Sequence, residues 1–311
     1  MRADAWKLLL SYTPLNINLR ESTIKKKRLE YFDICKIYDS LLENPLKTMN
    51  EVDYKTFKQI SVDVPRTMPE FKIFGYESIR KLMLRVLFIW SMRHPASGYV
   101  QGFNDLISPF ITVFLIATIS KNTTEDKLKD LDLYALDFSE EFMKENGINE
   151  TTIFELEADT YWCFSKMMDK VQSNYTNNQP GLQKMMSKME EIIKLLDIEL
   201  VKHLQMNEVS FMQFSFRWMN CYLMREFSLK LIIRLWDTYF SEENAFNNFH
   251  LFVCACLLLN FGDKIKKFEF QETIMFLQNL PTSAWSLADL DMLIAKSYQA
   301  SVLYGNCSFL K

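Results

Sequence analysis

Apolar residues recur at helical spacing through most of the chain. Within residues 77–91, Ile79, Leu82, Val86 and Ile89 fall near heptad spacing, which predicts a strong helix with one buried face. No credible run of strands appears elsewhere, so we predict an all-α fold. The expected helices cover residues 5–10, 22–38, 54–63, 77–91, 106–119, 154–171, 229–239, 246–261, 270–280 and 287–298, with 181–196 and the aromatic-rich 209–223 as further segments of the second lobe.

Polar segments between these helices suggest two lobes. Residues 43–50 form a polar loop that contains proline, and 121–149 form a variable, partly mobile connection with short helical pieces. The polar break at 174–181 (Asn-Tyr-Thr-Asn-Asn-Gln-Pro-Gly) is a natural seam. We therefore expect an N-terminal lobe over 1–173 and a C-terminal lobe over 174–311. No internal repeat is apparent, which argues against an α-solenoid adaptor.

The expected helix over 22–38 carries both apolar and basic residues. Its candidate inward positions are Leu29, Phe32 and Ile37. The basic run at 25–28 (Lys-Lys-Lys-Arg) could be a localisation signal or a lipid contact. Acidic neighbours such as Glu30 instead favour a solvated helix face.

Composition narrows the function classes. The 311 residues are 49% hydrophobic with only 7 Gly and 8 Pro, which suits a helical protein with an ample core. A formal net charge of −3 gives no general drive toward nucleic acid or anionic lipid. The longest apolar run, 106–119, contains Pro109 and is shorter than the roughly 20 residues that a membrane span needs. We expect no transmembrane segment and no secretory leader.

The positions of the cysteine, histidine and tryptophan residues predict structural roles and no catalytic or metal-binding roles. None of the 6 cysteines forms a C-x-x-C pair, so buried free thiols in a reducing compartment are expected. The 3 histidines have no metal-ligand spacing, and we predict no metal site. Arg234 and Asp237 are expected to make a structural ion pair or cap contact. The expected core tryptophans are Trp6, Trp90, Trp162, Trp218, Trp236 and Trp285.

Two stretches set a long polar side chain beside a chain breaker. In the first, Ile60 and Asp63 share one helical face, and Pro65 disfavours helical geometry at Val64, so the helix should end or kink before Arg66. In the second, Pro95 and Gly98 interrupt an apolar helix, and Gln101 follows the break directly before Gly102.

These residues carry a family resemblance. Ile60-x-x-Asp63-x-x-Arg66 and Tyr99-x-Gln101 resemble the paired fingerprint motifs of the TBC domain, the catalytic domain of Rab GTPase-activating proteins. Further matches, over nearly the whole chain, are Trp6-Lys7-Leu8-Leu9 with Tyr12 and Pro14, Arg217-Trp218-Met219-Asn220, Arg225-Glu226 and Arg234-Leu235-Trp236-Asp237-Thr238. The run from His94 to Gly102 is similar to the Golgi-associated branch. The resemblance implies a two-lobed, all-helical TBC domain over 1–311.

The resemblance also implies a role for each motif. Arg66 would be an arginine finger, and Gln101 a glutamine finger. Arginine suits the task because its planar fork reaches two phosphate oxygens and keeps its charge. One glutamine amide can accept a bond from the attacking water and donate another to an oxygen. The expected loop-supporting residues are Ile60, Asp63, Tyr99, Gly102, Asn104 and Asp105, with Asp63 bonded to backbone or to a basic side chain.

The partner implied is a GTP-bound Rab, seated on the face that bears both fingers. The Rab would bring nucleotide and Mg²⁺, so this chain would need no cofactor, and it has no Gly-x-x-x-x-Gly-Lys loop of its own. Its expected place is the cytoplasm, peripheral to Golgi or endomembranes through partners, in vesicle trafficking. The alternative is a catalytically weak Rab-binding or scaffolding module. A self-contained hydrolase is disfavoured because no carboxylate pair has a supporting context.

Overall fold

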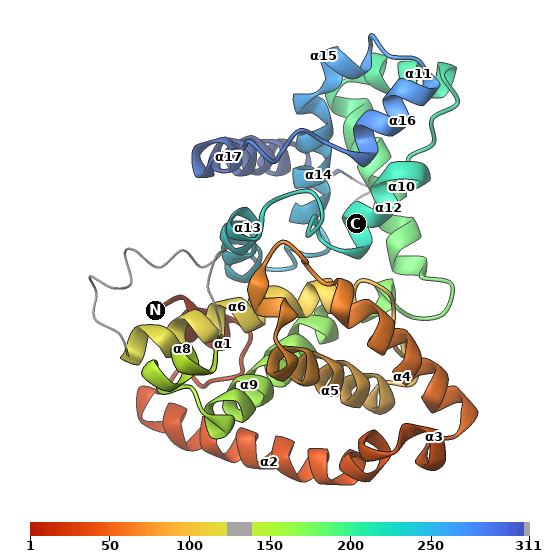
Figure 1. Ribbon diagram of the computed structural model, residues 1–311. Coiled ribbons are helices and arrows are strands. Elements are labelled where there is room, and N and C mark those ends of the chain that lie inside the picture. Colours follow the sequence, from red (N-terminus) through yellow and green to blue (C-terminus); the bar gives the residue numbers. More distant parts are fainter. Residues whose placement is uncertain (123–138, 308–311) are drawn as a thin grey trace. The chain divides into compact units, whose positions relative to one another are not determined.

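A computed structural model of the chain describes residues 1–122 and 139–307, in which every regular element is a helix (Figure 1). The chain forms two compact units, Met1–Asp169 and Lys170–Lys311. The first unit ends inside a long helix, four residues before the boundary expected at 173. The expected connection at 121–149 lies mostly outside the described residues.

The first unit is built around α5 (Glu77–Arg93) and α6 (Phe103–Asn122), which were both predicted from the sequence with shorter ranges. Helix α6 is the more apolar of the two, and its Phe103, Leu106, Phe110 and Ile119 are completely buried. The helices of this unit are α1 (Arg2–Leu9), α2 (Ile17–Glu43), α3 (Pro45–Thr48), α4 (Glu51–Asp63), η1 (Val64–Arg66), η2 (Lys72–Gly75), α5 (Glu77–Arg93), α6 (Phe103–Asn122), α8 (Glu140–Glu145) and α9 (Glu150–Val171), of which η1 and η2 are 3₁₀ turns. The predicted loop at 43–50 therefore contains a short helix.

The predicted inward positions of α2 are wrong. Leu29, Phe32 and Ile37 are 58%, 45% and 67% exposed, whereas Tyr31 and Cys35 are buried. Tyr31 and Cys35 lie four residues apart on one face, and each residue turns the helix by about 100°. Phe32 therefore points about 80° away from the middle of that face, and Leu29 and Ile37 point about 140° away. A helix at the edge of a fold buries only a narrow stripe, and here that stripe is aromatic and polar.

The length predicted for α6 is also wrong. The helix runs over Phe103–Asn122, and it is long and apolar enough to cross a membrane. Pro109 does not end it. However, 78% of its apolar window is buried inside the fold, and a buried core helix of a globular protein has the same length and composition.

The second unit is also helical and has its own core. Its α14 is apolar all round, with Leu251, Val253, Ala255 and Leu257 completely buried, and it packs against α10 and α17. The helices are η3 (Gln172–Asn174), α10 (Pro180–Leu196), α11 (Ile198–Met206), α12 (Met212–Asn220), α13 (Leu229–Ser241), α14 (Phe249–Asn260), α15 (Gly262–Ile265), α16 (Phe270–Gln278) and α17 (Leu287–Tyr304). Helix α11 was not predicted, because Asp197 separates it from α10 by a single residue.

The cysteines and most tryptophans have the structural roles that were predicted. All cysteines are free, and only Cys307 is not buried. Trp6, Trp90, Trp218 and Trp236 are buried, whereas Trp162 and Trp285 are partly exposed. Arg234 forms an ion pair with Asp291 of α17 at 2.9 Å.

Candidate functional site

The first of the two predicted finger loops, here the arginine loop, comprises residues 63–67. Ile60 and Asp63 are both buried on one face of α4, as predicted. The α-helix ends at Asp63, before Arg66, as predicted. Val64 nevertheless keeps helical dihedral angles (φ −55°, ψ −48°), so the non-helical geometry expected at Val64 is wrong. Val64 is buried, and Thr67 N–H bonds its carbonyl at 3.1 Å, which offsets the preference imposed by proline. Arg66 is exposed at the end of this 3₁₀ turn.

The second loop, here the glutamine loop, comprises residues 94–102 between α5 and α6. Its first residue is anchored, because His94 Nδ1 donates to the carbonyl of Trp90 at 2.7 Å and the two rings stack. Gly98 and Gly102 have φ of +60° and +108°, a region that favours glycine, and they turn the chain back toward α6. Gln101 is exposed and Gly102 beside it is buried.

Hydrogen bonds between buried and partly buried side chains join the two loops and the start of α6. Tyr99 donates its hydroxyl to Asp63 Oδ2 at 3.0 Å and lies 3.3 Å from Asn104 Oδ1. Asn104 Nδ2 donates to Thr67 Oγ1 at 2.9 Å. Asn104 Oδ1 also accepts the N–H of Gly102 at 3.2 Å. The arginine loop is therefore bonded twice, directly to Tyr99 of the glutamine loop and, through Thr67, to Asn104 on the first turn of α6, which in turn bonds Gly102.

The electrostatics of this network favour a protonated tyrosine. Burial, followed by the charge of Asp63 and the hydrogen bond to it, raises the pKa of Tyr99 far above its ordinary value. The hydroxyl therefore stays a donor at any physiological pH. A hydrogen bond to a charged acceptor is stronger than one to a neutral acceptor, so Tyr99 donates its hydroxyl mainly to Asp63 and not to Asn104.

The predicted loop-supporting residues lie in or beside the two loops, but the hydrogen-bond partner of Asp63 differs from the prediction. Asp63 was expected to bond backbone or a basic side chain, but its carboxylate accepts the Tyr99 hydroxyl of the other loop. Asp105, on the first turn of α6, accepts from Asn104 Nδ2 at 3.3 Å. Ile60 lies in the core beneath the arginine loop.

Sequence reasoning missed Thr67. A threonine that follows Pro-Arg on a loop is usually solvated. Thr67, however, is 1% exposed, and its hydroxyl bonds the carbonyl of Asp63 and the side chain of Asn104. The only feature of the sequence that could have pointed to Thr67 is its position directly after Arg66. Among the described residues, no three His, Cys, Asp or Glu side chains gather as a metal site would require.

Comparison with known proteins adds independent findings. The family model for the Rab-GTPase-TBC domain matches residues 1–266. The chain is 41% identical to "GTPase-activating protein gyp1" of Schizosaccharomyces pombe, over 97% of this chain and 55% of that protein. It is 40% identical to human "TBC1 domain family member 22A", over 98% of this chain and 55% of that protein. The chain thus spans about half the length of these relatives.

Solved structures agree with the family model. The crystal structure of the Ypt/Rab-GAP domain of Gyp1p superposes with a TM-score of 0.84 at 38% identity, covering 97% of this chain and 88% of that one. A Chlamydomonas flagellar RabGAP TBC domain superposes with a TM-score of 0.55 at 16% identity, which supports the fold alone. From the family model and the close structural neighbour together, we conclude that the chain belongs to the Rab-GTPase-TBC domain family.

Proposed function

We propose that this chain is the GTPase-activating domain of a protein that acts on a Rab-family GTPase, with Arg66 and Gln101 entering the partner's active site. The observation that carries the proposal is the pair of exposed polar side chains on two short loops, which are joined by the bond from Tyr99 to Asp63 and held by the bond from Asn104 to Thr67. Family membership and the relatives' activity support it.

Arg66 suits the role of the transition-state cation. It lies at the end of a turn stiffened by Pro65, and no hydrogen bond or ion pair occupies its guanidinium among the described residues. Small GTPases are slow because charge that builds on the phosphates is poorly stabilised. An arginine supplied in trans contributes roughly 10³–10⁵ in rate, or about 4–7 kcal/mol.

Gln101 suits the role of the residue that orients the attacking water. Its amide is on the exposed side of the loop, while Tyr99 and Asn104 hold the backbone on either side. Nucleotide and Mg²⁺ belong to the Rab in this scheme, and this chain supplies only side chains. We further propose a role in vesicle trafficking, at Golgi or other endomembranes that carry the Rab.

The test is phosphate release from a panel of GTP-loaded Rabs with catalytic amounts of this chain. We expect at least one Rab to be strongly activated. Arg66→Ala should lower activation by at least about 10²-fold, and Arg66→Lys should also be severely impaired because a point charge cannot copy the guanidinium fork. Full activity in either variant would remove Arg66 from the mechanism. A Rab that binds without acceleration would instead favour a scaffolding module.

A further inference from the structure

Thr67 occupies the contact between the two loops although the recognised motifs do not include it. Its side chain is 1% exposed. The hydroxyl donates to the carbonyl of Asp63 at 3.3 Å and accepts from Asn104 Nδ2 at 2.9 Å. The hydroxyl therefore donates within the arginine loop and accepts from the first turn of α6, directly after the glutamine loop.

Four residues form a ring that is held by three hydrogen bonds and one close contact. Asn104 Nδ2 donates to Thr67, and the Tyr99 hydroxyl donates to the carboxylate of Asp63. Between these two bonds, the Tyr99 hydroxyl oxygen lies 3.3 Å from Asn104 Oδ1. Asp63 returns to Thr67 through its own carbonyl. Tyr99 bonds the arginine loop directly, and Asn104 bonds both Thr67 and the N–H of Gly102. A shift of one loop therefore strains the bonds of the other.

The ring lies directly beside both proposed fingers. Arg66 precedes Thr67 in the chain, and Gln101 lies between Tyr99 and Gly102, whose N–H bonds Asn104. A displacement of about 1 Å at a reacting group can cost 10²-fold in rate. The spacing of the fingers is therefore sensitive to any bond that spans the loops.

We propose that Thr67 is a positioning residue that couples the arginine loop to the glutamine loop, so that both fingers enter the partner's nucleotide site as one unit. The kinetic part of this proposal rests on the proposed function. The coupling of the loops rests on the geometry alone, and so it can be tested without a partner.

The test variant is Thr67→Val, which keeps the branched shape but removes the hydroxyl. Thr67→Ser restores the hydroxyl. The matched control is Thr56→Val, on the same helix region, because the Thr56 hydroxyl bonds only the carbonyl of Val52 within α4. Asn104 keeps its bond to Asp105 in every variant, which favours a folded protein.

Amide hydrogen exchange of the full chain measures the coupling directly. Thr67→Val should speed exchange in peptides covering residues 98–102 by up to about tenfold, although the substitution is on the other loop. Thr67→Ser and Thr56→Val should exchange like the wild type. Unchanged exchange at 98–102 in Thr67→Val, or equal acceleration in Thr56→Val, would overturn the proposal.

Kinetics then measure the consequence. With a Rab that the wild type activates, Thr67→Val should lower kcat by about tenfold or more, leave the KM for GTP-loaded Rab within about twofold, and be rescued by Thr67→Ser. A loss that Thr67→Ser does not restore, accompanied by a lower melting temperature, would make Thr67 a packing residue and overturn the proposal. If the wild type activates no Rab, the proposed function fails, while hydrogen exchange still decides the coupling.

Discussion

Arg66 and Gln101 are exposed residues whose environment is set by buried neighbours. Asp63, Asn104 and Thr67 are 7%, 3% and 1% exposed, and each bonds a group on the other loop or beside it. A polar side chain buried with its bonding capacity satisfied is held in one geometry, because each lost bond leaves an unpaired group away from water. These buried side chains therefore also fix the backbone from which Arg66 and Gln101 project.

Gln101 separates the proposed mechanism from one in which the activator supplies only arginine. If Gln101 orients the water, a Rab whose own switch glutamine is changed to Ala or Leu should still respond to this chain. Gln101→Ala should lose activation by about tenfold or more, since it removes bonds made chiefly in the transition state. The measurement is single-turnover hydrolysis with both Rabs. Full activation by Gln101→Ala, together with an unresponsive glutamine-less Rab, would contradict the dual-finger mechanism.

His250 in the second unit carries a prediction about acid stability. The ring is fully buried, its Nε2–H donates to the carbonyl of Trp218 at 3.1 Å, and Nδ1 accepts from the Tyr239 hydroxyl at 2.8 Å. Burial lowers the pKa of His250 to about 3, although the bond to Trp218 opposes the shift. In the unfolded chain His250 binds a proton near its ordinary pKa of about 6.5, whereas in the folded state it stays neutral at that pH.

The stability linked to His250 is present above the unfolded pKa and is lost as the pH falls from about 6.5 toward 3. His250→Gln keeps one donor and one acceptor but does not titrate. Between those pH values the wild type should lose about 1.4 kcal/mol per pH unit relative to this variant. Urea unfolding at several pH values measures the difference. Parallel pH curves for the two proteins would show that His250 is protonated in the folded state.

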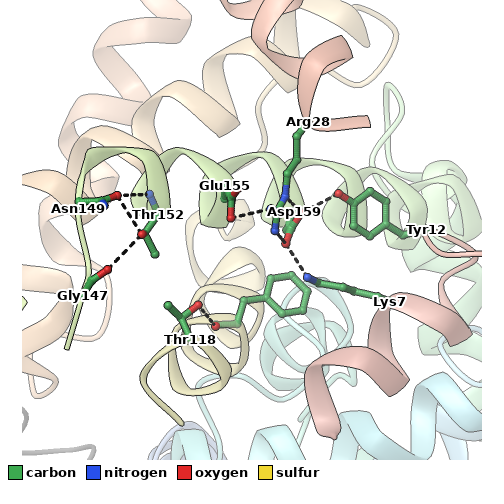
Figure 2. Close-up of polar contacts among 10 residues, drawn as sticks. Lys7, Tyr12, Arg28, Thr118, Gly147, Asn149, Thr152, Glu155 and Asp159 are labelled. Carbon is green, nitrogen blue, oxygen red and sulfur yellow. Dashed lines mark hydrogen bonds and ion pairs between the residues drawn. The ribbon is translucent and has the colours of Figure 1, made fainter. Parts of the chain in front are cut away.

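At the scale of elements, α9 organises the first unit through two buried carboxylates. Glu157 bonds Arg85 of α5 and Tyr31 of α2. Asp159 accepts bonds from α1, α2 and the segment between them, from Lys7 at 2.5 Å, Tyr12 at 2.6 Å and Arg28 at 2.8 Å, and Figure 2 shows these donors converging on it. Burial alone would raise the pKa of Asp159, but Arg28 and Lys7 outweigh it and lower that pKa.

Asp159→Ala should therefore be strongly destabilising. It would leave Lys7, Tyr12 and Arg28 without their common acceptor, and breaking a buried ion pair in this way costs about 3–5 kcal/mol. The control is Glu155→Ala on the same helix, since Glu155 also contacts Arg28 but its side chain is 46% exposed and should contribute less than about 1 kcal/mol. Urea unfolding followed by circular dichroism compares the variants. Equal destabilisation by both would refute the role assigned to Asp159.

At the scale of the whole molecule, each unit has its own apolar helix. Helix α14 is the core of the second unit, and α6 is the core of the first. The composition of α6 alone fits a membrane span, but Ser108 and Thr112 on it are buried and bond their own helix. Its apolar surface is covered by the helices of its unit, so a bilayer would have little left to contact.

We predict that α6 does not insert into lipid. The chain should remain in the aqueous phase when a nonionic detergent is taken through its cloud point, because most of the apolar window is buried inside the fold. Ile111→Asp should unfold the first unit, since Ile111 is completely buried and the new charge would have no partner. Partition of the folded wild type into detergent would show that α6 is exposed to lipid.

Periodicity and motif spacing alone determined the all-α class, most helices, and the positions of Arg66 and Gln101. The helix over 77–91 is an example, since it differs from α5 by two residues at one end. These features are local, because a helix repeats every 3.6 residues and because chain breakers such as Pro65 and Gly98 mark loops in the sequence itself. The expected roles of Arg66 and Gln101 came from the family resemblance, because the spacing alone does not indicate a function for either loop.

Tertiary structure alone decided which neighbours each residue meets. The burial of Tyr31 in place of Leu29, Phe32 and Ile37 depends on which face of α2 contacts α9, and nothing within α2 marks that face. Val64 stays helical before proline because its burial and the Thr67 bond outweigh a local preference. Thr67 and Asn104 lie 37 residues apart in sequence, and only folding brings hydroxyl and amide within 2.9 Å. Contacts between distant segments are set by packing free energy summed over the whole unit, which no local pattern in the sequence records.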